Sequence, residues 1–225
     1  MSRSALVTGA ARGIGAAIAE RLRADDWQVH TVDVEDGDLS TREGNRAVVD
    51  AALARFGGRL DAVVANAGFQ HVAPVRDFPE EQWEKLQALL LTSPFLLAKY
   101  AWDALSASGD GRFLVVASVH GLVASPFKAG YVAAKHGVLG LVKVPALEGA
   151  DAGISAAALC PAYVRTAIVE GQLQERPLED LLAPQAVKRL LEPAEVAAAA
   201  AWLLGPDGRS VTGAPLVMDL GWTAR

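Results

Sequence analysis

The fold is decided by the stretch Ala5-Leu6-Val7-Thr8-Gly9-Ala10-Ala11-Arg12-Gly13-Ile14-Gly15. Its first residues form a short apolar run that predicts a buried strand, and a glycine-rich turn follows. Ile14, Ile18 and Leu22 then recur every four residues, which gives the next helix one buried face. In a strand–turn–helix unit of this kind, the free N–H groups of the helix N-terminus can hold a pyrophosphate. The pattern therefore predicts a dinucleotide-binding unit.

The glycine turn has the spacing G-x-x-x-G-x-G, and its candidate cofactor-binding residues are Gly9, Arg12, Gly13, Ile14 and Gly15. Asp33 ends a second predicted strand at residues 29–32, at the distance where a carboxylate reaches the adenosine ribose hydroxyls. Its charge repels a 2′-phosphate and favours NAD over NADP. Arg12 argues the other way, because a guanidinium in the turn can contact that phosphate. Alternatively, Asp33 only caps the following turn.

Short apolar runs alternate with helical patterns along the rest of the chain, which predicts a single α/β domain over residues 1–225 with a doubly wound, Rossmann-like parallel sheet. Further strands are expected at 62–65, 113–117, 154–159 and 216–219. Helices are expected at 41–56, with Ser40 or Thr41 as N-cap, and at 79–106, 131–147 and 193–204. Pro94 and Pro145 should bend or end their helices. Residues 165–190 should form an irregular, partly helical lid.

The connection after the second strand is unusually short. Only residues 34–37 separate Asp33 from Asp38 and Leu39, which we also count as candidate cofactor-binding residues. A parallel crossover needs a dozen or more residues. We therefore expect the helix at this point to be truncated or missing.

Composition narrows the functional class. The chain is 52% hydrophobic and carries a formal net charge of −5, which argues against nucleic-acid or anionic-membrane surfaces. Cys160 is the single cysteine and fits a reducing cytoplasm. No signal peptide is visible, and the longest apolar run, residues 196–204, is too short to span a membrane. We expect a cytoplasmic protein with a small-molecule substrate and no metal site.

Three side chains are suited to moving a proton on and off an alcohol oxygen. Tyr131 is a phenol with an ordinary pKa near ~10, and Lys135 lies one helical turn further on, on the same face. A nearby ammonium favours phenolate and lowers the tyrosine pKa. Ser118, thirteen residues before Tyr131, could hydrogen-bond the reacting oxygen. Alternatively, this spacing is only a packed aromatic beside a solvated lysine.

Several motifs appear in one order: T-G-A-A-R-G-I-G at 8–15, Asp33, A-N-A-G at 65–68, Ser118, Y-x-x-x-K at 131–135 and C-P-A-Y-V-R-T at 160–166. Together they resemble the short-chain dehydrogenase/reductase family over essentially the whole chain. The resemblance implies an NAD(P)-dependent oxidoreductase, commonly a homotetramer, with Ser118, Tyr131 and Lys135 as catalytic residues. It also implies cofactor contacts for Asn66, Tyr131, Lys135, Val164 and Thr166.

A narrower resemblance is carried by G-F-Q-H-V-A-P at 68–74, H-G-L-V-A-S-P-F-K at 120–128 and V-R-T-A-I-V-E-G-Q at 164–172. These stretches are similar to the D-3-hydroxybutyrate dehydrogenase branch. The resemblance implies that Gln70, His120, Lys128 and Gln172 hold a substrate carboxylate. One cation with several neutral donors suits a small carboxylate. Alternatively, Lys128 is a solvated loop charge and Gln172 a surface residue.

The chain departs from the family pattern at Leu90, where an asparagine is usual, at Ala162 and Leu220, which replace glycines, and in its shorter lid. Leucine cannot bind the water that links the lysine to solvent. The main hypothesis is NAD-dependent oxidation of a small 3-hydroxy acid, (R)-3-hydroxybutyrate to acetoacetate, with Tyr131 as general base. The alternatives are a dehydrogenase or reductase of another ketone or secondary alcohol, and a weakly active or non-catalytic NAD-binding protein.

Overall fold

The computed structural model describes residues 2–174 and 176–224. Its sheet is parallel throughout and has the order β2-β1-β3-β4-β5-β6. The strands are β1 Ser4–Thr8, β2 Gln28–Val32, β3 Ala62–Ala65, β4 Arg112–Val116, β5 Ser155–Pro161 and β6 Pro215–Met218. The chain runs outward from β1 to β2 and then returns to the other side of β1 for β3. This reversal creates a crevice at the carboxyl ends of β1 and β3, where ligands of such sheets bind.

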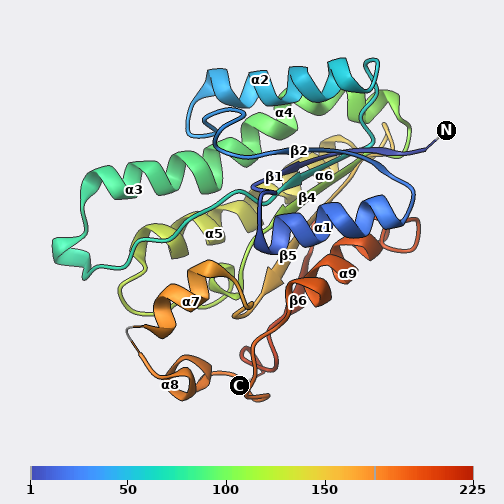
Figure 1. Cartoon of the computed structure of the whole chain (residues 1–225). Coiled ribbons are helices and arrows are strands. Elements are labelled where there is room, and N and C mark those ends of the chain that lie inside the picture. Colours follow the sequence, from blue (N-terminus) through green and yellow to red (C-terminus); the bar gives the residue numbers. More distant parts are fainter. Residues whose placement is uncertain (1, 175, 225) are drawn as a thin grey trace.

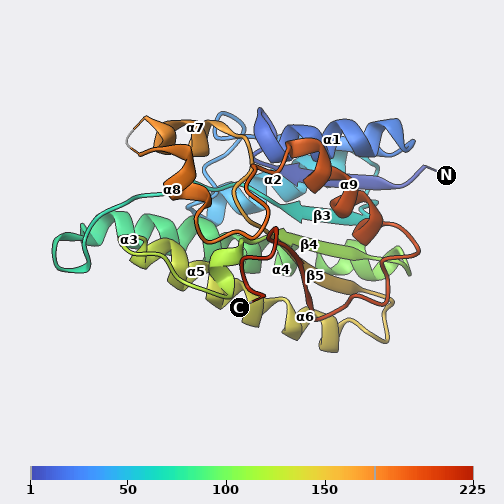
Figure 2. The same cartoon turned by 90° about the horizontal axis from the view of Figure 1, so that it is seen from below.

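Helices cover both faces of the sheet, as the doubly wound prediction requires (Figures 1 and 2). On one face lie α1 Gly13–Ala24 and α9 Pro193–Leu204, and on the other lie α2 Arg42–Arg55, α4 Ser93–Ala107, α5 Ala129–Leu141 and α6 Lys143–Glu148. Successive residues of β1 point to opposite layers: Leu6 packs with the α2 side and Val7 with the α1 side. None of the described helices is both long and apolar enough to cross a membrane.

The short connection after β2 contains no helix and no further strand, which confirms the expectation from its length. Its residues form a tight turn in which Asp33 N donates to the Asp36 carboxylate (2.8 Å) and Asp36 N donates to the Asp33 carbonyl (3.0 Å). The chain then enters α2 directly. Of the two predicted N-caps Thr41 is the one used, since its hydroxyl accepts from Gly44 N at 3.0 Å. As a result β2 remains at the edge of the sheet.

Both helices are interrupted close to their prolines, as expected, but each interruption lies a few residues before the proline. The stretch 79–106 is a helix α3, Glu80–Gln87, a π-helical turn, Ala88–Thr92, and α4. Pro94 has no N–H to donate to the carbonyl four residues earlier, and the wider turn directly before it accommodates that loss. The helix predicted over 131–147 starts earlier, at Ala129, and is interrupted at Val142. It resumes as α6 through Pro145. β5 extends through Pro161, past its predicted end.

The lid has a small core of its own. It contains two short helices, α7 Ala167–Leu173 and α8 Leu178–Leu182, within the partly helical excursion that was expected. Val169, Leu181 and Leu182 pack with Tyr163 and Leu190 in a cluster separate from the two main cores. The lid follows β5 in the chain and lies at the carboxyl edge of the sheet (Figure 1).

Candidate active site

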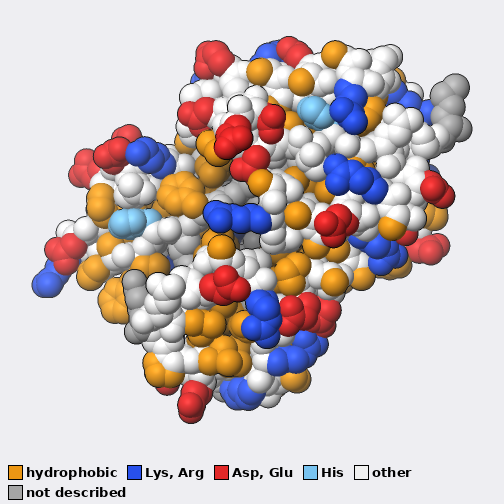
Figure 3. Space-filling model, in the orientation of Figure 1, with side chains coloured by type: hydrophobic (Ala, Val, Ile, Leu, Met, Phe, Trp, Pro, Cys, Tyr) orange, Lys and Arg blue, Asp and Glu red, His pale blue; other side chains and the backbone are white. Residues whose placement is uncertain are grey.

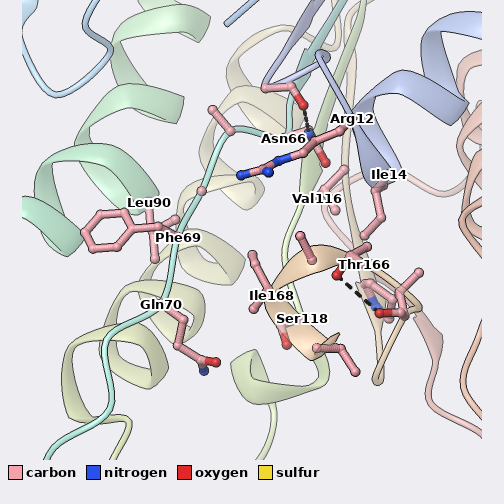
Figure 4. A pocket seen from close by; sticks show the side chains of 18 of the residues that line it. Arg12, Ile14, Asn66, Phe69, Gln70, Leu90, Val116, Ser118, Thr166 and Ile168 are labelled. Carbon is pink, nitrogen blue, oxygen red and sulfur yellow. Dashed lines mark hydrogen bonds between the residues drawn. The ribbon is translucent and has the colours of Figure 1, made fainter. Parts of the chain in front are cut away.

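A cavity of about 1040 Å³ opens at the carboxyl edge of the sheet. The segments that follow β1, β3, β4 and β5 all line it, together with α5 and α7. Figure 3 shows a hollow at the centre of this face, with a basic side chain lying in it. Figure 4 shows that Arg12, Asn66, Gln70, Ser118 and Thr166 surround one space although they come from distant parts of the chain. The cavity is large enough to take a dinucleotide and a small substrate.

The glycine turn is built so that the backbone comes close to neighbouring segments. Gly9 (φ +62°) and Gly13 (φ +61°) adopt left-handed conformations that side chains disfavour. A Cβ on Gly15 would overlap the Gly9 carbonyl and the Asn66 side chain. Asn66 braces the turn, since its Nδ2 donates to the carbonyls of Thr8 (3.0 Å) and Gly9 (2.9 Å). Asn66 thus shapes the end of the cavity beside the glycine turn.

Replacing Gly15 by alanine should therefore disrupt the turn and weaken dinucleotide binding by about tenfold or more, because a preorganised phosphate cradle is lost. Fluorescence titration with NADH would measure this, alongside thermal unfolding. Gly140→Ala is the matched control, since Gly140 is also helical and a Cβ there meets no atom within 4 Å. Equal NADH affinity in the two variants would contradict this account of the turn.

Asp33 caps the turn that follows it and also braces the glycine turn, and its role toward a ribose stays a prediction. One carboxylate oxygen accepts from Ala11 N (2.9 Å), and the other accepts from Val34 N (2.9 Å). It lines the cavity together with Asp38 and Leu39, at the same end as Arg12. The Arg12 side chain reaches across the cavity in Figure 4. Both features that bear on the choice between NAD and NADP are therefore present at one end of the site.

The predicted catalytic residues meet on the floor of the cavity. Ser118 follows β4, while Tyr131 and Lys135 lie one turn apart on α5. Lys135 Nζ donates to the Val116 carbonyl (2.8 Å) and lies 5.6 Å from the centre of the Tyr131 ring. The alternative of a solvated lysine is wrong, because Lys135 is only 5% exposed.

Burial, and not the ammonium, dominates the electrostatics of Tyr131. Removal from water raises the pKa of its phenol, and interaction with the Ser118 hydroxyl opposes this rise. The expected lowering by Lys135 is not found, because the group that lowers the Tyr131 pKa is the Ser118 hydroxyl. Burial also lowers the pKa of Lys135 to about 8. The unliganded chain thus favours a neutral phenol.

The four proposed carboxylate ligands line the same cavity. Gln172 Nε2 donates to Gln70 Oε1 at 2.6 Å, which joins α7 to the loop after β3. His120 and Lys128 are 3% and 6% exposed. The alternative readings are thus wrong: Lys128 is not a solvated loop charge, and Gln172 is half-buried and bridges two segments.

The charges of this part of the site have clear causes. Burial lowers the pKa of Lys128 to about 8, and the positive charge of Arg176 acts in the same direction. Burial lowers the pKa of His120 to about 3, with a further contribution from Lys128. At neutral pH His120 is therefore a neutral imidazole beside a mostly cationic lysine.

Three residues at this end escaped the sequence analysis as candidates. The His120 ring meets Trp222 and Tyr163 at centroid distances of 5.4 and 6.3 Å, and its Nε2 lies 3.0 Å from Ser125 Oγ. Lys128 Nζ lies 5.3 Å above the Tyr163 ring. Tyr163 and Ser125 fall within motifs quoted above, where they could have been singled out. Trp222 lies beyond β6, and no local pattern points to it.

The departures from the family pattern have structural counterparts. Leu90, 2% exposed, packs with Leu86, Ala134 and Tyr131 and makes an apolar wall behind the phenol. Ala162 N donates to the Met218 carbonyl (2.9 Å). Leu220 has φ +54°, and its carbonyl accepts hydrogen bonds from Ala186 N and Val187 N. These bonds connect the C-terminal turn to the end of the lid.

In the described parts of the chain no group of three or more His, Cys, Asp or Glu side chains is placed to hold a metal.

Comparison with known proteins agrees with this geometry. A family model described as Enoyl-(Acyl carrier protein) reductase matches residues 32–223. The chain belongs to the short-chain dehydrogenase/reductase family, as its motifs indicated.

Its relatives include dehydrogenases of hydroxy acids. The chain is 38% identical to the D-beta-hydroxybutyrate dehydrogenase of Rhizobium meliloti (strain 1021), over 260 aligned positions that cover 100% of both chains. It is 36% identical to the enzyme of that name from Cupriavidus necator, with 99% of this chain and 98% of the relative covered. It is 35% identical to the cis-4-hydroxycyclohexanecarboxylate dehydrogenase of Sinomonas cyclohexanicum, with 99% and 97% covered. The narrower resemblance is thus confirmed, and the chain is similar to oxidoreductases of small hydroxy acids.

Proposed function

We propose that the protein oxidises (R)-3-hydroxybutyrate, a small 3-hydroxy acid, to acetoacetate with NAD. The observation that carries the proposal is the Lys128 ammonium, which is buried within the cavity and has no carboxylate partner among the described residues. A buried charge is unfavourable unless it is paired. A substrate carboxylate would pair with it, and Gln70, His120 and Gln172 would hydrogen-bond the same group.

The hydroxyl end of such a substrate would lie at Ser118 and Tyr131. Tyr131, once ionised, takes the hydroxyl proton, and Ser118 donates a hydrogen bond to the reacting oxygen. Ser118 already counteracts the effect of burial on the Tyr131 pKa. When bound, NAD supplies the acceptor for the hydride that leaves the carbinol carbon. Lys135, buried beneath Tyr131, contributes a positive charge and further N–H donors toward the cofactor ribose.

The cofactor end of the cavity fits a dinucleotide because the glycine turn brings Gly9, Gly13 and Ile14 to the cavity wall at the start of α1, in a packing so close that a Cβ at Gly15 would overlap the Gly9 carbonyl. Gly9, Gly13, Ile14 and the helix N-terminus would hold the pyrophosphate. Asn66 would shape the turn, and Val164 and Thr166 would lie at the nicotinamide, joined by a hydrogen bond from the Thr166 hydroxyl to the Val164 carbonyl (3.3 Å).

Cofactor choice is decided at the adenosine end. Asp33, Asp38 and Leu39 would line the adenosine ribose there. The Asp33 charge disfavours NADP, and its two backbone hydrogen bonds keep it in place. Arg12 acts in the opposite direction, because its guanidinium can contact the 2′-phosphate of NADP.

The direct test follows NADH or NADPH absorbance with (R)- and (S)-3-hydroxybutyrate and each cofactor. We expect reduction of NAD by the R isomer alone. A preference for the S isomer or for NADP would overturn the corresponding part of the proposal.

A second candidate is a dehydrogenase of a cyclic hydroxy acid, which the Sinomonas cyclohexanicum relative favours. A cyclic hydroxy acid carries a carboxylate, as 3-hydroxybutyrate does, but its ring needs more space beneath the lid. Faster turnover of cis-4-hydroxycyclohexanecarboxylate in the same assay would select it. NADH binding without turnover of either acid, or of a neutral secondary alcohol, would instead select the non-catalytic alternative that Leu90 raised.

The pH dependence of substrate binding should follow Lys128. Because burial lowers its pKa to about 8, the side chain is cationic below that pH and neutral above it. The KM for 3-hydroxybutyrate should be flat below about pH 7 and should rise toward tenfold per unit well above pH 8. Lys128→Arg stays charged over this range and should flatten the KM profile. A wild-type KM independent of pH between 7 and 9.5 would contradict a carboxylate held by Lys128.

We further propose that the protein acts in the cytoplasm as a homotetramer. A single buried cysteine, Cys160, fits a reducing compartment. Trp202 on α9 and Val217 on β6 are 43% and 38% exposed, and such apolar surfaces favour self-association. Light scattering on the purified protein should give four times the mass of one chain, and a monomeric mass would exclude this assembly.

A further inference from the structure

We propose that Ser125 is a positioning residue that holds His120 in the tautomer with its N–H on Nδ1, facing the substrate. The inference rests on the proposed function, because it concerns how the site hydrogen-bonds a substrate carboxylate. Ser125 lies in the loop between β4 and α5 and touches the site only through other side chains. It is therefore distinct from the four carboxylate ligands proposed above.

The His120 ring is fixed in place from several sides. Its backbone N–H donates to Ser118 Oγ (3.1 Å), and its Nε2 lies 3.0 Å from Ser125 Oγ. The rings of Tyr131, Tyr163 and Trp222 meet it edge-on, with centroids 5.4 to 6.3 Å away. Rotation of the ring would break these contacts, so the two nitrogens keep their directions.

Only one ring nitrogen is left for a ligand. Nδ1 makes no hydrogen bond within the described chain, and it is not among the polar atoms sealed from solvent without a partner. His120 lines the cavity beside Lys128. Nδ1 is therefore the atom that can meet a substrate oxygen.

The direction of the Ser125 hydrogen bond decides what Nδ1 offers. A neutral imidazole carries one N–H, so one nitrogen donates and the other accepts. If Nε2–H donated to Ser125, Nδ1 would present a lone pair to the carboxylate, which is repulsive. If Ser125 donates to Nε2, the N–H lies on Nδ1 and binds the carboxylate oxygen next to the Lys128 ammonium.

The Ser125 hydroxyl is able to make the second arrangement. A serine hydroxyl has one hydrogen and two acceptor lone pairs, so it can donate to Nε2, 3.0 Å away, while its lone pairs accept from other groups. With Ser125 as the donor, the single ring N–H lies on Nδ1, at the substrate end of the site.

The His120 ring does not become charged, so the choice lies between its two neutral tautomers. The groups that act on or contact His120 are Lys128 and His136, whose charges disfavour imidazolium, and the neutral rings of Tyr131, Tyr163 and Trp222. The ring is neutral over the working range. The position of its single proton is then the property that Ser125 controls.

The test reads the tautomer directly. In protein with 15N-labelled histidine, the His120 signals are assigned as those absent from His120→Gln, and their shifts report which nitrogen is protonated. Wild type should show Nδ1–H. Ser125→Ala should show a mixture or the Nε2–H form, and Ser125→Thr, which keeps the hydroxyl, should restore wild-type shifts. Ser108→Ala is the matched control, since Ser108 is also half-buried and hydrogen-bonded but far from the site.

Kinetics gives the second readout. Ser125→Ala should raise the KM for 3-hydroxybutyrate by about tenfold, the effect of losing one hydrogen bond to a charged group, while NADH affinity stays unchanged. An Nε2–H ring in wild type, or shifts unaltered in Ser125→Ala, would overturn the inference even if the enzyme oxidises 3-hydroxybutyrate. Conversely, an Nδ1–H ring that responds to Ser125→Ala in a protein inactive on this acid would support the role of Ser125 and reject the substrate.

Discussion

Tyr131→Phe is expected to lower kcat for 3-hydroxybutyrate oxidation by about 10²–10⁴-fold, the usual contribution of a positioned general base. Phenylalanine keeps the ring that packs against Leu86, Leu90 and Ala134, so the cavity should retain its shape. NADH affinity and the unfolding temperature should therefore stay close to wild type. Steady-state turnover and NADH titration on the same preparation would measure both.

The matched control is Tyr100→Phe, because Tyr100 lies on α4, packs under Arg46 of α2 and does not line the cavity. It should turn over at the wild-type rate. Near-normal turnover by Tyr131→Phe would remove Tyr131 as the base. A loss of both turnover and NADH binding would show that the residue acts through structure instead.

Lys128→Met should lower kcat/KM for 3-hydroxybutyrate on the order of 10²-fold, because the substrate carboxylate would be buried without its cation. At neutral pH the variant should also be more stable than wild type. The reason is that a buried ammonium with a pKa lowered to about 8 destabilises the unliganded fold below that pH, and methionine fills a similar volume without charge. This combination of weaker binding and higher stability distinguishes a ligand-binding cation from a structural one.

Two comparisons sharpen this experiment. Lys143→Met removes a lysine that is exposed at the start of α6, and it should change neither property. Turnover of a neutral secondary alcohol by Lys128→Met should equal that of wild type. An equal loss of turnover on acid and neutral substrates would show that Lys128 supports the fold of the site and does not bind a carboxylate.

Local sequence patterns determined much of the fold. The apolar run and glycine turn of residues 5–15 predicted β1, the turn and α1, because buried strands and phosphate-binding turns depend on neighbouring residues. The four residues after Asp33 were too few for a crossover, and the missing helix follows from chain length alone. The spacing of Tyr131 and Lys135 placed both on one helical face for the same kind of reason.

The charge states of the site were decided by the tertiary structure. Lys135 was expected to lower the pKa of Tyr131, yet burial by segments from several strands and helices raises it. Desolvation is a sum over all neighbours in space, so no spacing within one helix predicts it. The same holds for Lys128, whose burial creates a cation with no carboxylate partner among the described residues, and the proposed substrate depends on it.

The contacts that complete the site are also tertiary. Gln172 meets Gln70 across 102 residues of sequence, and Trp222 reaches His120 from beyond the last strand. Sequence determined which chemical groups the protein carries and the succession of helices and strands along the chain, because these follow from local periodicity and chain length. Only the folded structure decided which groups share the cavity and how far each is removed from water, since both depend on distances between segments that are remote in sequence.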